Sequence, residues 1–140
     1  MLELPGSHFP ITSLYAALLG FVFVALSIHV VRARLKHEVS IGHGGIDDLH
    51  LAQRRQGNFV EYVPYALVLL VLLEASNTSA WILHALGGGL LFARILHPFG
   101  FYPEFALRLP RLIGTVVTWI VLASGSAALL YGALAGGAQA

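Results

Sequence analysis

Hydrophobic residues are concentrated in four long runs, separated by shorter connections that carry most of the polar residues. The runs cover roughly residues 11–31, 59–75, 79–97 and 112–134. As α-helices they would each be about 17 to 23 residues long, and about 20 apolar residues are needed to cross the hydrocarbon layer of a membrane. The pattern therefore predicts four membrane-spanning helices.

The composition favours a membrane protein over a soluble one. Charged residues make up 11% of the chain and hydrophobic residues 57%, whereas soluble domains are about 25% charged. Any one run would suit the buried core of a soluble protein, but four in 140 residues leave too little polar sequence to coat one. We expect an all-α integral membrane protein, a four-helix bundle that forms a single domain over residues 1–140. The first run lacks a basic leader and is too long for a cleaved signal peptide.

Basic residues lie on one side of the predicted spans. All eight fall in or beside the first and third connections: Arg32, Arg34, Lys36, Arg54, Arg55, Arg94, Arg108 and Arg111. In a four-span protein these two connections share a side of the membrane, and loops rich in Lys and Arg stay in the cytoplasm. We therefore expect both termini outside the cytoplasm, and a tight antiparallel hairpin of the second and third spans across the short turn at 76–79.

Two local patterns concern connections and packing. "GHGGIDD" offers His43, Asp47 and Asp48, but it lacks the Lys-Ser/Thr ending of a phosphate-binding loop and the spacing of standard metal loops. It favours a turn that leads into an Asp-capped helix, and we expect no metal site. In the third span, Gly87 and Arg94 are seven residues apart and so share a face, where a glycine allows close helix packing.

The segment "RRQGNFVEYVP" places polar residues on one face of the second span. At about 100° per residue, Asn58, Glu61 and Tyr65 fall within about 40° of Arg54, and Tyr62 lies at the edge of this stripe. A carboxylate costs about 2.5 to 3.5 kcal/mol near the membrane centre, and less toward the interface. Such a stripe therefore faces something other than lipid.

Three interpretations of the stripe follow from the residues alone. Glu61 could form an ion pair, with Arg54 or with an arginine of another helix, that holds the bundle together. The surplus of arginines at the same end favours an anion site instead, because guanidinium groups bind carboxylates in a bidentate way. That site could serve catalysis or could simply hold an anionic ligand or lipid headgroup. A small proton-coupled exporter that uses Glu61 is the third interpretation.

The same segment resembles the second-helix signature of the MAPEG family, the membrane-associated proteins in eicosanoid and glutathione metabolism. Arg54, Asn58, Glu61, Tyr62 and Pro64 stand at the signature's spacing, with Gln56 also in place. "FARILH" and "FALRLPR" resemble the family as well. The resemblance extends over nearly the whole chain.

This resemblance implies a homotrimer of four-helix bundles in membrane lipid, similar to small bacterial members of the family in the inner membrane. Glutathione, as co-substrate, would bind between subunits near the cytoplasmic face. Its expected contacts are Arg34, Arg54, Gln56, Asn58, Glu61, Tyr62 and Arg94. Arg108, in "LRL", would stabilise the glutathione thiolate, with Arg111 close enough to be the alternative. We expect no nucleic-acid partner.

The implied activity is that of a glutathione transferase or peroxidase acting on hydrophobic electrophiles. A guanidinium beside sulfur would lower the thiol pKa from about 8.5, and only the thiolate attacks well. The chain has no cysteine of its own. Phe101 and His97 stand where various relatives carry tyrosine. The resemblance therefore supports the fold and the glutathione site more strongly than it supports the activity. We expect His97 to cap a helix, and His29 and His84 to form hydrogen bonds between helices.

Overall fold

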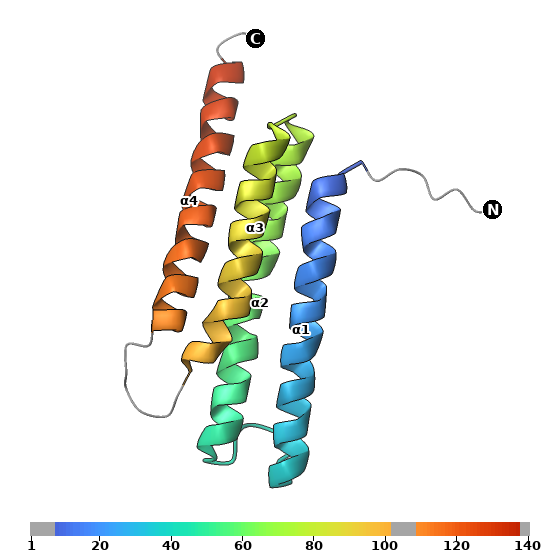
Figure 1. Ribbon diagram of the computed structural model, residues 1–140, viewed down its shortest axis with the longest axis vertical. Helices are drawn as coiled ribbons and strands as arrows, with labels where there is room; N and C mark the ends of the chain where they lie inside the picture. Colours follow the sequence, from blue (N-terminus) through green and yellow to red (C-terminus); the bar gives the residue numbers. More distant parts are fainter. Residues whose placement is uncertain (1–7, 102–108, 138–140) are drawn as a thin grey trace, which may run out of the picture.

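The described part of the chain forms four long helices, which run alongside one another (Figure 1). The structure is a computed structural model that describes residues 8–101 and 109–137. In chain order the elements are α1 (Pro10–His37), α2 (Asp47–Ala75), α3 (Ala80–Leu96), the short 3-10 helix η1 (His97–Gly100) and α4 (Leu109–Gly137). The four long helices, with η1 extending α3, are long and apolar enough to cross a membrane. The predicted all-α fold and the prediction of four helices able to span a membrane are therefore confirmed.

The α2–α3 hairpin forms the centre of the bundle. Both α1 and α4 pack against it, and they lie on its two sides in Figure 1. The turn that joins α2 to α3 is tight, since the amide nitrogen of Thr78 donates to the carbonyl oxygen of Leu73 at 3.1 Å. At the far end from this turn, α1 and α3 end and α2 and α4 begin, so the described basic residues gather there. We call this the basic end.

Large apolar side chains cover the outside of the bundle. Phe21 is 75% exposed, Trp81 73% and Leu130 61%, whereas Leu19 and Leu90 in the core are at most 1% exposed. Such extensive apolar exposure would favour aggregation in water, but it suits a surface that is solvated by lipid. The packing therefore agrees with a membrane-spanning bundle.

Polar contacts fix α1 at the end opposite the basic end. The carboxylate of Glu74 accepts hydrogen bonds from the backbone nitrogens of Ile11, at 2.9 Å, and Thr12, at 2.8 Å. It thereby satisfies two of the free donors that begin any helix and faces the positive end of the helix dipole. One helical turn further on, the Tyr15 hydroxyl lies 3.1 Å from Nδ1 of His84. The predicted role of His84 between helices is confirmed.

Neither α2 nor α3 begins with a side-chain cap. Ser79 is the N-cap of α3, but its side chain makes no capping hydrogen bond. The N-cap of α2 is Ile46, so the prediction of an Asp-capped helix was wrong. Instead, Asp48 lies in the first turn of α2 and pairs with Lys36 at 3.0 Å and with His37 at 2.9 Å. The carboxylate stabilises the approach of α1 to α2 rather than the start of its own helix.

Gly87 allows α1 and α3 to pack closely. A Cβ atom built at Gly87 would overlap ring atoms of Tyr15, at distances that no real Cβ shows. The glycine is buried, as is Arg94 on the same face. The expected close packing at this glycine is therefore confirmed.

Substituting Gly87→Ala should destabilise the protein by about 1–3 kcal/mol, because the Tyr15 ring must move and lose its contacts with His84. Unfolding in detergent with increasing SDS would measure the effect. Gly20→Ala is the matched control, since a Cβ there meets no heavy atom within 4 Å. Equal stability of the two variants would contradict this account of the packing.

Candidate functional site

Arg94 is the centre of a polar cluster near the basic end. Its guanidinium, in α3, donates from Nη1 to Oδ1 of Asn58 in α2 at 2.9 Å. From Nη2 it donates to the carbonyl oxygen of Gly114 in α4 at 3.0 Å and to the hydroxyl of Thr118. The Thr118 hydroxyl in turn donates to the Gly114 carbonyl at 2.7 Å. One side chain thus joins three helices.

The charge of Arg94 has no acidic partner within the described part of the chain. The residue is 2% exposed, and its Nε atom is buried without a hydrogen-bond partner. The Tyr62 ring lies beside it, with 5.6 Å between the guanidinium carbon and the ring centroid. Because a buried charge is costly unless it is compensated, the cluster is a region of positive potential bordered by Asn58 and Tyr62.

Glu61 lies on the outward side of α2 and pairs with Arg54. Glu61 Oε1 and Arg54 Nη1 are 3.3 Å apart, and both side chains are about half exposed, at 50% and 47%. Of the partners considered for Glu61, the structure shows Arg54 on the same helix. The pair lies within α2 and is not a link between helices, so it does not hold the bundle together.

Other residues of the predicted site already have partners inside the chain. Arg34 donates to backbone carbonyls of the first connection: Val39 at 3.3 Å, Ser40 at 2.9 Å and Gly42 at 3.2 Å. The amide nitrogen of Gln56 donates to the Ser27 hydroxyl at 2.8 Å. These two side chains stabilise the first connection and the α1–α2 contact, and their predicted role in binding a ligand stays a prediction.

Arg108, with Arg111 as the alternative, was predicted to stabilise the thiolate. Arg108 lies outside the described residues. Arg111 is exposed near the start of α4, with its guanidinium carbon 4.7 Å from the centroid of the Phe101 ring. His97 occupies the C-cap position of α3 and is buried, which confirms its predicted place at a helix end.

Two residues take part in the polar contacts at the basic end although no sequence pattern indicated them. Thr118 was not singled out, although Gly114 and Thr118 are four residues apart and so share the face of α4 that meets Arg94. Arg55 was counted only as a positive charge, yet it binds His29 at 3.1 Å and the carbonyl oxygen of Phe101 at 2.9 Å. The first of these bonds confirms the predicted interhelical role of His29.

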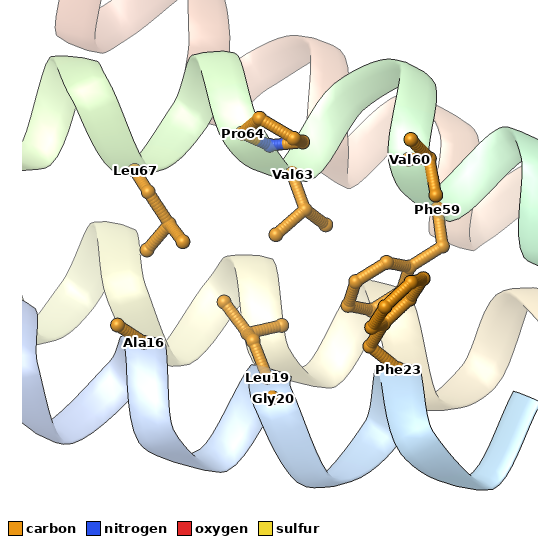
Figure 2. A pocket seen from close by; sticks show the side chains of 9 residues that line it. All are labelled: Ala16, Leu19, Gly20, Phe23, Phe59, Val60, Val63, Pro64 and Leu67. Atoms are coloured by element: carbon orange, nitrogen blue, oxygen red, sulfur yellow. The ribbon is translucent and has the colours of Figure 1, made fainter. Parts of the chain in front are cut away.

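An apolar groove of about 270 Å³ lies between α1 and α2. In Figure 2 the side chains of Leu19 on α1 and of Val63 and Leu67 on α2 face one another across it. The rings of Phe23 and Phe59 stack at one end of the groove, 5.8 Å between centroids. Phe59 directly follows Asn58 in the chain, so this end of the groove lies at the same height along α2 as the polar cluster.

The profile of the MAPEG family matches residues 12–131. The chain belongs to the MAPEG family. It is 37% identical over 112 residues to the inner membrane protein YecN of Escherichia coli K12, a match that covers 80% of this chain and 84% of YecN. YecN of Escherichia coli O6:H1 strain CFT073 is similar to the same extent. No solved structure matches the chain.

Replacing Thr118 by Val should cost about 1–3 kcal/mol, because the buried Arg94 guanidinium would lose an acceptor without any change in side-chain size. Unfolding in detergent would measure this loss. Thr115→Val is the matched control, since Thr115 is half-buried on the same helix and does not bind Arg94. The account of the cluster would be wrong if both valine variants were as stable as the wild type.

Proposed function

We propose that this MAPEG protein is a glutathione-binding membrane transferase or peroxidase that activates the glutathione thiolate for attack on hydrophobic electrophiles. The observation that carries the proposal is the buried Arg94, whose charge no described carboxylate compensates. It lies against Asn58 and Tyr62, two residues of the family signature. Such a site favours an anion, and glutathione carries two carboxylates as well as an ionisable thiol.

In this proposal the signature residues act at two levels. Arg54, Glu61 and Tyr62 lie on α2 with part of their side chains accessible, and they contact the peptide directly. Arg94 supplies the positive potential beside Tyr62, and Asn58 holds the Arg94 guanidinium in place. Arg34 and Gln56 border the same end of the bundle and complete the set of contacts.

Arg108 would supply the positive charge that the chemical step requires. A guanidinium close to sulfur stabilises the thiolate relative to the thiol, and each unit by which the thiol pKa falls corresponds to about 1.4 kcal/mol. The thiolate then attacks the electrophile, so no nucleophile from the protein is needed. This suits a chain that has no cysteine.

We further propose that the protein is a homotrimer. The half-exposed Arg54–Glu61 pair and the 57% exposed Tyr65 lie on a helix apolar enough to span a membrane. Because charged side chains facing lipid are costly, a neighbouring subunit would cover this face. The electrophile would reach the site from the lipid, past apolar surfaces such as the groove between α1 and α2, while glutathione arrives from water.

The basic end of the bundle is proposed to face the cytoplasm of a bacterial inner membrane. Because the chain has no cysteine, single substitutions can report its orientation. Ile41→Cys, at a residue that is 90% exposed in the first connection, should resist a membrane-impermeant thiol reagent in intact cells and react after permeabilisation. Ser79→Cys, in the opposite turn, should react in intact cells. The reverse pattern would place the basic end outside.

Glutathione mixed with the purified protein should give an ultraviolet difference spectrum of bound thiolate. Arg108→Ala should abolish this signal and the turnover of model electrophiles while leaving the oligomer intact, because it removes only the stabilising charge. Arg111→Ala is the comparison and should retain the thiolate signal when glutathione is present at a saturating concentration. A signal that survives in Arg108→Ala would reject the assignment, and its loss in Arg111→Ala alone would give the role to Arg111.

The alternative functions predict different experimental results. Binding of glutathione by calorimetry without any thiolate signal would indicate a non-catalytic site for an anionic ligand or lipid headgroup. The proton-coupled exporter needs an isolated carboxylate, and the Arg54–Glu61 pair at 3.3 Å weighs against it. Proton-driven efflux from vesicles that disappears in Glu61→Gln would restore that interpretation.

A further inference from the structure

Phe101 is held from three sides at the basic end. Its backbone carbonyl accepts a hydrogen bond from Nη2 of Arg55 at 2.9 Å. Its ring lies under the guanidinium of Arg111, 4.7 Å from carbon to centroid, and meets the His97 ring edge-on at 5.1 Å. The residue is 6% exposed. Phe101 therefore connects an arginine of α2 with an arginine of α4.

Both terminal nitrogens of the Arg55 guanidinium form hydrogen bonds within the protein. Its Nη1 lies 3.1 Å from Nε2 of His29 on α1, its Nη2 binds the Phe101 carbonyl, and its Nε is buried. No described carboxylate pairs with it. The guanidinium thus holds α1 and the end of η1 against α2, and it is not free to bind a ligand.

Arg111, in contrast, presents an accessible guanidinium. The residue is exposed, and none of the described acidic residues pairs with it. The backbone of Arg111 packs closely against η1, since a Cβ atom at Gly100 would collide with the backbone nitrogen and Cβ of Arg111. An arginine that is held over an aromatic ring loses less conformational freedom when it binds an anion than a freely moving one does.

We propose that Arg55 is a positioning residue: through Phe101 it holds Arg111 as a preorganised guanidinium that raises the affinity of the site for its anionic ligand. Arg55 does not touch the ligand. Its bond to the Phe101 carbonyl places the ring on which Arg111 rests. This inference rests on the proposed function for the identity of the ligand, glutathione, but the contacts themselves do not depend on it.

A double-mutant cycle tests the connection between the two arginines. Calorimetry would measure the Kd of glutathione for the wild type, Arg55→Gln, Arg111→Ala and the double variant. Each single substitution should weaken binding about tenfold, the equivalent of one charge-assisted hydrogen bond. The double variant should bind no more weakly than Arg111→Ala alone, because Arg55 acts through Arg111. Losses that multiply in the double variant would overturn the inference.

Two further variants distinguish the positioning of Arg111 from a general effect of net charge. Phe101→Leu keeps the backbone carbonyl and much of the buried apolar volume but removes the ring, so it should weaken glutathione binding as much as Arg111→Ala does. Lys36→Ala removes an exposed positive charge that pairs with Asp48 and should leave the Kd unchanged. An equal loss in Lys36→Ala would attribute the effect to net charge and overturn the inference.

A measurement without ligand keeps this test distinct from that of the proposed function. The Nε–Hε order parameter of Arg111, from nitrogen-15 relaxation in detergent, should fall in Arg55→Gln and in Phe101→Leu but not in Lys36→Ala. An unchanged order parameter would overturn the positioning role whether or not glutathione binds. A wild type that binds no glutathione would reject the proposed function, and the order parameter would still decide whether Arg55 positions Arg111.

Discussion

The hydrogen bonds of the buried Arg94 guanidinium are the interaction on which the basic end of this bundle depends. A charge at 2% exposure is tolerated only where fixed acceptors replace water. Here the acceptors come from Asn58 on α2 and from Gly114 and Thr118 on α4. Gly114 is essential to this geometry, because a Cβ there would lie 2.8 Å from the Ala93 carbonyl oxygen. The glycine allows α4 to approach α3 closely enough for its own carbonyl to reach the arginine.

Buried polar groups find their hydrogen-bond partners in different ways at the two ends of the bundle. At the end away from the basic residues, the carboxylate of Glu74 meets the backbone donors that begin α1. At the basic end, the guanidinium groups of Arg55 and Arg94 are held by carbonyl, amide, hydroxyl and imidazole acceptors. Neutral acceptors satisfy the hydrogen bonds but leave the positive charge in place. This end therefore retains a positive potential, which is the physical basis for proposing an anionic ligand there.

The family signature on α2 serves the fold as well as the proposed site. Asn58 and Gln56 are already engaged by Arg94 and Ser27, so their presence in the signature has a structural explanation. Arg54 and Glu61 form a half-exposed pair that does not join helices. These two contribute little to the packing of one chain. Their place on a membrane-spanning helix agrees better with the proposed contacts to a ligand or to a neighbouring subunit.

The four apolar helices, the gathering of basic residues in two connections and the signature on α2 could all be predicted from the sequence, because hydrophobicity, charge and short spacings are properties of neighbouring residues. The sequence also indicated the pairing of Glu61 with Arg54, two turns apart on one helix. The packing of the helices, by contrast, was needed to show that Asp48 binds Lys36 and that Ile46 is the N-cap of α2. It also decided that Arg55 would meet Phe101, 46 residues away, and that Thr118 would accept from Arg94. Such pairs depend on the rotation and relative height of packed helices, which no local pattern encodes.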